Sequence, residues 1–255
     1  MVVFPNPKIN LGLNIVSRRS DGYHNIETIF YPVTSILDVL EIVVAPKGSP
    51  TTLSVTGNAI DCPVEKNLVM RAYSLLNQIH SLPNVDIHLH KRIPDGAGLG
   101  GGSADAAFML KALNELFQLG HTQSELSALA STLGADCAFF IYNRPMLGTG
   151  IGNDLTPVDV DLSDYEIRME KPDVSISTKE AYSNVLPAYP EVPLNEIIKR
   201  PVEEWRDDLK NDFERSVFPL HPEIAKIKQR NYELGAVYSS MSGSGSAVFG
   251  IFKNN

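Results

Sequence analysis

The sequence predicts an α+β protein of two domains, and three observations lead to this prediction. Residues 1–91 hold several short apolar or alternating segments typical of strands, interrupted by one segment with helical spacing. A glycine-rich segment at residues 93–107 precedes two further helical patterns. Beyond residue 155 the composition of the chain changes, with more prolines and new turn-forming segments. We therefore expect an N-terminal domain at residues 1–156 and a C-terminal domain at 157–255.

The part of the chain before the glycine-rich segment is expected to form mainly strands. They are predicted at residues 8–16, 27–32, 39–45, 52–56 and 85–91. A helix is predicted at residues 67–79, where Leu68, Ala72, Leu76 and their neighbours place apolar side chains on one helical face.

Two helices are expected to follow the glycine-rich segment. The first covers residues 104–117 and is closed by Gly120, and the second begins at Thr122, which forms a capping box with Glu125. Residues 137–142 are predicted to form a short apolar strand. Asp136 would then lie at a helix-to-strand junction, a place that often lines a cleft.

The C-terminal domain is expected to mix short strands and helices. A strand is predicted at residues 165–169, and Ser177 with Glu180 forms a second capping box. Helices are predicted around residues 194–199 and 221–233. Strands should flank a second loop rich in glycine and serine at residues 241–246.

Composition excludes several classes of partner. The chain of 255 residues has a formal net charge of −8 and no run of Lys or Arg, which disfavours nucleic acid and anionic membranes as partners. No apolar run approaches the roughly 18 residues of a membrane span, and no signal segment is recognisable. Cys62 and Cys137 lack the spacing of metal ligands. We expect a cytoplasmic protein that binds small molecules, and the sequence does not indicate its oligomeric state.

The segment IPDGAGLGGGSADAA at residues 93–107 is predicted to bind phosphate. Glycine allows backbone amides to turn toward one point, and the helix start that follows adds unpaired amides and a positive dipole end. The anion is expected against residues 98–103.

A dinucleotide-binding turn, a P-loop and a flexible linker fit this segment less well. Residues 96–101 satisfy the G-x-G-x-x-G pattern, but a dinucleotide-binding fold places that pattern in its first strand-helix turn. A P-loop requires a lysine, and this loop has none. A flexible linker is not expected directly between a strand and a helix.

His88 and His90 form an H-x-H pair that could bind a metal ion. No third ligand is apparent, and Val85, Ile87 and Leu89 alternate with the histidines. The pair is therefore better interpreted as the outer side of a half-buried strand.

Three segments together resemble the three motifs of the GHMP kinases: PNPKINLGLNI, PDGAGLGGGSADAA and SSMSGSGSAVFGIF. The segments RRSDGYHNIETIF and LGADCAFFI further resemble the branch of this family that phosphorylates a cytidine-diphosphate-linked methylerythritol in the non-mevalonate isoprenoid pathway. The similarity extends from Pro5 to Phe252. It implies a two-domain GHMP kinase fold with its active site in the interdomain cleft.

The resemblance implies ATP as co-substrate. The residues expected to bind it are Asn67, Pro94, Gly96, Ala97, Gly98, Leu99, Gly100, Gly101, Gly102 and Ser103. Asn67 would lie near the adenine, although a helix N-cap explains it equally well. Because the loop has no lysine, Mg²⁺ is expected to neutralise the phosphates, with the Ser103 hydroxyl as candidate ligand. A simple N-cap is the alternative for Ser103.

Lys8 and Asp136 are the candidate catalytic residues. Asp136 is expected to receive the proton of the substrate hydroxyl, as the matching aspartate does in the family, or else to orient that hydroxyl. A capping or structural carboxylate is the alternative. Lys8 would stabilise the carboxylate and the developing charge, unless it is a surface lysine.

The acceptor substrate is expected to contact Asn10, Tyr23, His24, Asp136, Thr178 and Tyr182. Asp21 and Gly22 can form a turn that presents Tyr23 and His24 to a cytosine ring. Tyr182 matches a second aromatic of the family, although a core or surface tyrosine is also consistent with its position. Asn10 lies two residues from Lys8, so an extended strand presents both on one face.

Two rival functions stay open on the sequence. A GHMP kinase acting on homoserine, mevalonate or a sugar would have no base to stack on Tyr23 and His24. A non-catalytic nucleotide-binding protein would have no need of both Lys8 and Asp136.

Overall fold

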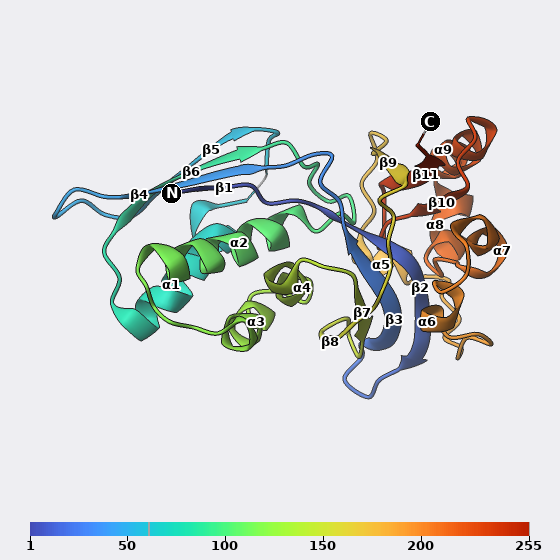
Figure 1. The fold of residues 1–255 in the computed structure, drawn as a ribbon, viewed down its shortest axis with the longest axis horizontal. Helices are drawn as coiled ribbons and strands as arrows, with labels where there is room; N and C mark the ends of the chain where they lie inside the picture. Colours follow the sequence, from blue (N-terminus) through green and yellow to red (C-terminus); the bar gives the residue numbers. More distant parts are fainter. Residues whose placement is uncertain (61, 255) are drawn as a thin grey trace. The chain divides into compact units, whose positions relative to one another are not determined.

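The computed structural model describes residues 1–60 and 62–254, which divide into two compact units (Figure 1). The first unit comprises Met1–Pro7, Ile36–Asp95 and Gly100–Asn143, and the second comprises Lys8–Ser35, Gly96–Leu99 and Arg144–Asn255. This division differs from the boundary expected near residue 156. The reason is that an early pair of strands joins a sheet completed by strands that follow residue 144.

The first unit is a four-stranded sheet with helices packed on it. Its elements are β1 (Val2–Val3), β4 (Val39–Val44), β5 (Thr52–Gly57), β6 (Val85–Lys91), the 3-10 helix η1 (Val64–Lys66), α1 (Leu68–His80), α2 (Gly101–Leu116), α3 (Gln123–Ser131) and α4 (Cys137–Tyr142). The strand order is β1-β4-β6-β5, and only β5 and β6 are parallel. Figure 1 shows α1 and α2 side by side along one face of this sheet.

Strand β6 shows why one face of this sheet is covered. Val85, Ile87 and Leu89 are buried, and His88 and His90, which alternate with them, are partly exposed on the other face. Both histidine rings are hydrogen-bonded to the Thr56 hydroxyl, whose Oγ1 is 2.9 Å from His88 Nε2 and 3.0 Å from His90 Nδ1. Across the described residues, no group of three His, Cys, Asp or Glu side chains could hold a metal ion. The alternating burial along β6 confirms the interpretation as a half-buried strand.

Two helix starts of this unit follow their predicted caps, whereas α2 begins at Gly101 with Gly100 as its N-cap, earlier than the expected start at residue 104, so Ser103 is not an N-cap. The Asn67 side chain accepts a hydrogen bond from the Val69 amide at 2.9 Å, which makes Asn67 the N-cap of α1. Thr122 and Glu125 form the complete capping box of α3. These local signals were sufficient because caps depend on residues only two or three positions apart.

The predicted strand at residues 137–142 is wrong, because Cys137–Tyr142 forms the helix α4. Its first five residues are all buried against α2 and α3. A short run that is apolar on every side carries no periodicity, so it cannot be assigned to strand or helix from sequence alone. Asp136 consequently lies at the start of a helix rather than before a strand.

The second unit contains two antiparallel sheets and short helices. Its elements are β2 (Lys8–Arg18), β3 (His24–Pro32), β7 (Met146–Thr149), β8 (Asp154–Pro157), β9 (Tyr165–Glu170), α5 (Thr178–Ala181), α6 (Leu194–Ile197), the 3-10 helix η2 (Val202–Glu204), α7 (Trp205–Asp208), α8 (Glu214–Leu220), α9 (Pro222–Glu233), β10 (Tyr238–Met241) and β11 (Val248–Lys253). The strand orders are β2-β3-β7-β8 and β10-β11-β9. The strands β7 and β8 were not predicted.

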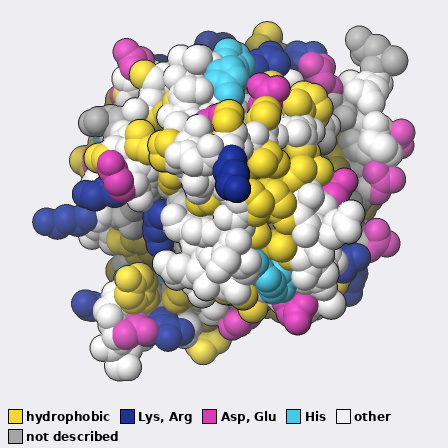
Figure 2. All heavy atoms as spheres, turned by 90° about the vertical axis from the view of Figure 1, so that its left-hand side faces the viewer, with side chains coloured by type: hydrophobic (Ala, Val, Ile, Leu, Met, Phe, Trp, Pro, Cys, Tyr) yellow, Lys and Arg dark blue, Asp and Glu magenta, His cyan; other side chains and the backbone are white. Residues whose placement is uncertain are grey.

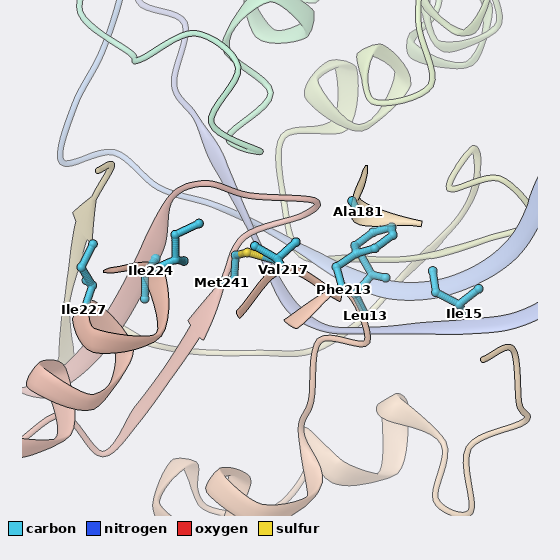
Figure 3. Close-up of a cluster of buried hydrophobic side chains, with 9 residues drawn as sticks. Leu13, Ile15, Ala181, Phe213, Val217, Ile224, Ile227 and Met241 are labelled. Atoms are coloured by element: carbon cyan, nitrogen blue, oxygen red, sulfur yellow. The ribbon is translucent and has the colours of Figure 1, made fainter. Parts of the chain in front are cut away.

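One apolar cluster ties the strand β2 to the helices of this unit. Figure 3 shows Leu13 and Ile15 of β2 packed with Phe213, with Val217 of α8 and with Met241 of β10. All five side chains are at most 4% exposed. The cluster therefore fixes the strand that begins with Lys8 and the loop that follows Met241.

Charges of both signs are mixed on the face of the molecule that Figure 2 draws. On the face drawn in Figure 2, Lys and Arg side chains alternate with Asp and Glu around an apolar strip, so the described side chains there form no continuous basic surface. No helix within residues 1–60 and 62–254 has the length and apolar character needed to cross a membrane.

Candidate active site

The glycine loop, residues 94–103, has the backbone of an anion-binding turn. Gly96, Gly98 and Gly100 adopt left-handed conformations with φ of 61°, 74° and 71°, and α2 begins directly after them. Alternation of this kind turns successive amides toward one side of the chain. The amides of residues 98–103 donate no hydrogen bond to any acceptor in the described part of the chain. They are therefore available to an anion at the N-terminus of a 16-residue helix.

The first half of the glycine loop is held by the glycine-serine turn at residues 241–247. The Ala247 amide donates to the Ala97 carbonyl at 3.1 Å, and Ser242 Oγ donates to the Gly98 carbonyl at 2.9 Å. A Cβ added at Gly98 would lie 2.0 Å from the Ser242 carbonyl oxygen. Only glycine fits here, because the two backbones are nearly in contact.

Lys8 is buried beside the same half of the loop. Its side chain is 3% exposed, its amide donates to the Leu99 carbonyl at 2.9 Å, and its Nζ donates to Asn10 Oδ1 at 2.6 Å. Asn10 in turn donates to Thr28 Oγ1 at 2.9 Å. Lys8 is therefore not a surface lysine, and β2 presents Lys8 and Asn10 on one face, as their spacing predicted.

The segment that carries Asp136 packs against the other half of the loop. A Cβ added at Gly134 would lie 3.3 Å from Cys137 Sγ and 3.9 Å from Ser103 Oγ. Burial raises the pKa of the Cys137 thiol to about 11, against the opposing effect of a hydrogen bond from Ser103. The thiol thus stays protonated and unreactive near neutral pH. Asp136 is half-buried, and its carboxylate does not cap α4 within the described structure.

The DGYH segment forms the predicted turn. Gly22 has φ of 88°, and the Tyr23 amide donates to Asp21 Oδ1 at 3.1 Å. Tyr23 is 65% exposed, whereas His24 stacks on Tyr182 with ring centroids 4.7 Å apart and an interplanar angle of 20°. Sequence reasoning did not foresee this pairing, in which Tyr182 supports one face of His24.

Thr178 and Tyr182 lie at the two ends of α5. Thr178 is its exposed first residue, and Ser177 caps the helix by accepting from the Glu180 amide at 3.2 Å. The Tyr182 ring also packs edge-on against Phe213 at 4.8 Å. The apolar cluster of the second unit therefore orients the ring that supports His24.

Asn67 lines a cavity of about 330 Å³ in the first unit. The cavity is walled by the apolar side chains of Leu53, Val55, Ile60 and Val64, with Asn58 and Asn67 as its amide groups. This combination of apolar walls and a few hydrogen-bonding groups suits a purine base. The sequence offered no signal for the walls, because they come from one strand and the irregular segment after it.

Sequence reasoning also missed a buried ion cluster formed by Lys91, Asp38 and Asp105. Lys91 Nζ pairs with the Asp38 carboxylate and lies 2.7 Å from Asp105 Oδ2. All three side chains are at most 4% exposed. The only available signal was the presence of single charges in otherwise apolar segments. Burial and the neighbouring Asp38 carboxylate raise the pKa of Asp105 to about 7, although Lys91 opposes this shift.

We expect Asp105→Asn to stabilise the protein more at pH 8 than at pH 5. The pKa of Asp105 is 3.8 in a model peptide and about 7 in the folded chain. Between these values the unfolded chain loses the proton and the folded chain keeps it, so folding loses stability as pH rises. Asparagine does not ionise, so the variant does not lose folding stability in this way as the pH rises. Urea unfolding at both pH values measures the difference, and an equal gain at each would contradict the expectation.

Each unit contains some of the predicted site residues. Lys8, Asn10 and residues 96–99 are joined by hydrogen bonds in the second unit. Ser103 and the turn at residues 134–137 meet in the first unit. Tyr23, His24, Thr178 and Tyr182 belong to the second unit, and Asn67 belongs to the first.

Comparisons with known proteins show what this chain is similar to as a whole. The family models of the GHMP kinase N-terminal and C-terminal domains match residues 67–144 and 194–255. A protein of Parabacteroides distasonis named 4-diphosphocytidyl-2-C-methyl-D-erythritol kinase is 57% identical over 99% of this chain and 92% of its own length. A protein of Bacteroides fragilis with the same name is 54% identical over the same shares. A crystal structure of 4-(cytidine 5'-diphospho)-2C-methyl-D-erythritol kinase superposes with a TM-score of 0.84 and 35% identity, covering 98% of this chain and 90% of that one.

The chain is a small-molecule kinase of the GHMP class, for which ATP is the co-substrate. Within that class it belongs to the 4-diphosphocytidyl-2-C-methyl-D-erythritol kinase family. The resemblance seen in the sequence motifs is thus confirmed.

Proposed function

We propose that this chain transfers the γ-phosphoryl group of ATP to the 2-hydroxyl of 4-diphosphocytidyl-2-C-methyl-D-erythritol, a step of isoprenoid precursor synthesis. Full-length similarity to relatives with that name supports the choice of substrate. The observation that carries the chemistry is a helix start whose amides have no acceptor among the described residues and against which the Asp136 segment packs. Because the reaction consumes ATP, we place it in the cytoplasm.

In this proposal the triphosphate lies along the glycine loop. The amides of residues 98–103 donate to phosphate oxygens, and the α2 dipole adds positive potential at the same place. The adenine enters the cavity beside Asn67, whose apolar walls cover its ring faces. Phosphoryl transfer depends mainly on this positioning, since its transition state spreads charge over the phosphoryl oxygens.

The residues at this site suit a Mg²⁺ ion that is held mainly by the phosphates of ATP. The described residues contain no cluster of three metal-binding side chains, and Mg²⁺ commonly keeps several waters and uses substrate phosphates as ligands. Ser103 is the hydroxyl that would reach such an ion after turning away from Cys137. The contribution of the Mg²⁺ ion would be to neutralise the charge of the phosphates.

Asp136 and Lys8 act on the acceptor. The Asp136 carboxylate accepts the proton of the 2-hydroxyl as the oxygen bonds to the γ-phosphorus, and ADP leaves when the bond to its β-phosphate oxygen breaks. Lys8 supplies a buried positive charge near the developing negative charge, and its hydrogen bond to Asn10 fixes its direction. Asn10 orients the methylerythritol part of the substrate.

The cytosine is recognised by Tyr23 and His24. The exposed Tyr23 ring offers a stacking face, and Tyr182 holds the His24 ring so that its nitrogens can meet the edge of the base. Thr178, at the exposed start of α5, contacts the same substrate.

We expect Tyr23→Ala to raise KM for the acceptor and to leave KM for ATP unchanged. Stacking of a base on an aromatic ring contributes about 1–3 kcal/mol, which corresponds to a change in KM of roughly 5- to 150-fold. Tyr189→Ala is the matched control, because Tyr189 is 79% exposed in the same unit and has no proposed role. Steady-state kinetics with each substrate varied in turn measure both KM values. Equal KM values for the acceptor in the two variants would contradict the role of Tyr23.

The proposed function is tested by a substrate panel with ATP and Mg²⁺, in which ADP formation is followed. We expect turnover with the cytidylylated substrate and none with homoserine, mevalonate or simple sugars. Inhibition by added CMP would support recognition of the base. Turnover of homoserine or mevalonate instead would assign another GHMP kinase activity, and nucleotide binding with no turnover on any acceptor would indicate a non-catalytic protein.

A further inference from the structure

The buried ion cluster of Lys91, Asp38 and Asp105 connects the two ends of the glycine loop. Asp38 Oδ1 accepts hydrogen bonds from the amides of Arg92 at 2.6 Å and Ile93 at 2.8 Å, directly before the loop begins. Asp105 lies in the second turn of α2, two residues after the loop ends. Lys91 joins these two carboxylates. The strand end and the helix start are therefore linked through one ammonium group.

Lys91 also lies directly beneath the helix start. A Cβ added at Gly101 would be 3.3 Å from Lys91 Nζ and 3.0 Å from Ile93 Cγ2. Gly101 thus allows α2 to approach the ammonium group closely. The position of the first helical turn, which carries three of the proposed phosphate-binding amides, follows the position of Lys91.

The energetics do not favour a purely stabilising role. Buried ion pairs can often be replaced by apolar side chains without loss of stability, because the desolvation of the charges offsets their attraction. The cluster also costs stability when Asp105 is ionised, because Oδ1 is then buried without a hydrogen-bond partner among the described residues, and burial raises the pKa of this carboxyl to about 7. A cluster whose arrangement costs stability is more readily explained by a requirement for accurate placement of the groups that it joins.

We propose that Lys91, Asp38 and Asp105 are positioning residues for ATP, which hold the start of α2 at a fixed distance from the end of β6 so that the loop amides keep their convergent arrangement. This inference rests on the proposed function of the loop. It goes beyond that function by assigning ATP affinity to three side chains outside the loop that do not touch the nucleotide. A displacement of the helix start would weaken the binding of ATP and leave the binding of the acceptor substrate largely unchanged.

The test compares Asp105→Leu with Asp105→Asn. Leucine removes the link to Lys91, and we expect KM for ATP to rise about tenfold or more, since small displacements of positioning groups have effects of this size. KM for the acceptor should change by less than about twofold on the same reasoning. In Asp105→Asn the amide oxygen can accept from Lys91 and the amide nitrogen can donate to Asp38, so we expect recovery to near the wild-type KM.

Leu110→Ala is the matched control, because Leu110 is fully buried in the same helix and its apolar side chain is not part of the ion cluster. It should lower the melting temperature without raising KM for ATP. If Asp105→Leu does not fold, the double variant Lys91→Met/Asp105→Leu removes one charge of each sign and is expected to show the same rise in KM. An unchanged KM for ATP in the folded variant, or an equal rise in Leu110→Ala, would overturn the proposal.

Titration calorimetry with a non-hydrolysable ATP analogue separates this proposal from the proposed function. A loss of affinity in Asp105→Leu that is restored in Asp105→Asn supports the positioning role even if the wild-type protein turns over none of the acceptors. Equal affinity in all variants would overturn the positioning role even if the wild-type protein is an active kinase.

Discussion

Replacing Asp136 by asparagine is expected to abolish phosphoryl transfer while ATP still binds. Asparagine keeps the size of the side chain and removes its ability to accept a proton, and a general base typically contributes about 10²- to 10⁴-fold to the rate. The nucleotide should bind normally because the amides of the glycine loop and the cavity beside Asn67 are unchanged. Coupled detection of ADP release measures the first effect, and calorimetry with an ATP analogue measures the second.

Asp86→Asn is a suitable control for this experiment. Asp86 lies on the outer face of β6 and accepts a hydrogen bond from Thr52 Oγ1 at 2.6 Å, so the variant also exchanges an aspartate for an amide in the first unit. We expect its activity to remain near that of the wild-type protein. Near-normal turnover in Asp136→Asn would exclude Asp136 as the residue that receives the proton.

Gly98→Ala is expected to cause the largest loss of ATP binding among single substitutions in the loop. The residue has φ of 74°, and a Cβ would lie 2.0 Å from the Ser242 carbonyl oxygen and 3.0 Å from its carbon. Both contacts are with backbone, so the glycine loop or the turn that supports it must move. We expect kcat/KM for ATP to fall by about 100-fold or more, as misplacement of positioning groups does elsewhere.

Gly235→Ala separates this clash from simple backbone strain. Gly235 has φ of 94°, and an added Cβ would have no atom within 4 Å. The control therefore introduces a left-handed alanine, which costs about 1–2 kcal/mol of stability, and nothing else. Similar kinetics for the two variants would show that contact between the glycine loop and the turn at residues 241–247 does not matter for ATP.

Local patterns predicted most of the strands and helices of this chain. The strand at residues 85–91 and the caps at Asn67 and Thr122 depend on periodicity or on side chains within a few positions, and both are visible in a single sequence. The helix Cys137–Tyr142 was mistaken for a strand because six apolar residues carry no period. The short strands β7 and β8 were missed because each has only four residues, next to a turn.

The parts of the site that escaped prediction depend on long-range pairing. Asp38 and Lys91 are 53 positions apart, and Lys91 and Asp105 are 14 apart, so their cluster exists only once the sheet and α2 have packed. The same holds for the stack of His24 on Tyr182, which joins the beginning of β3 to the end of α5. Glycine-rich loops could be identified beforehand because their chemistry depends on the backbone of one continuous segment.

The most direct test of the proposed mechanism is a crystal structure of the chain with a non-hydrolysable ATP analogue and the cytidylylated acceptor. We predict that the triphosphate oxygens accept hydrogen bonds from the amides of residues 98–103, and that the acceptor 2-hydroxyl contacts Asp136 with its oxygen about 3–3.5 Å from the γ-phosphorus. A triphosphate bound away from the glycine loop, or a hydroxyl out of reach of Asp136, would contradict the mechanism.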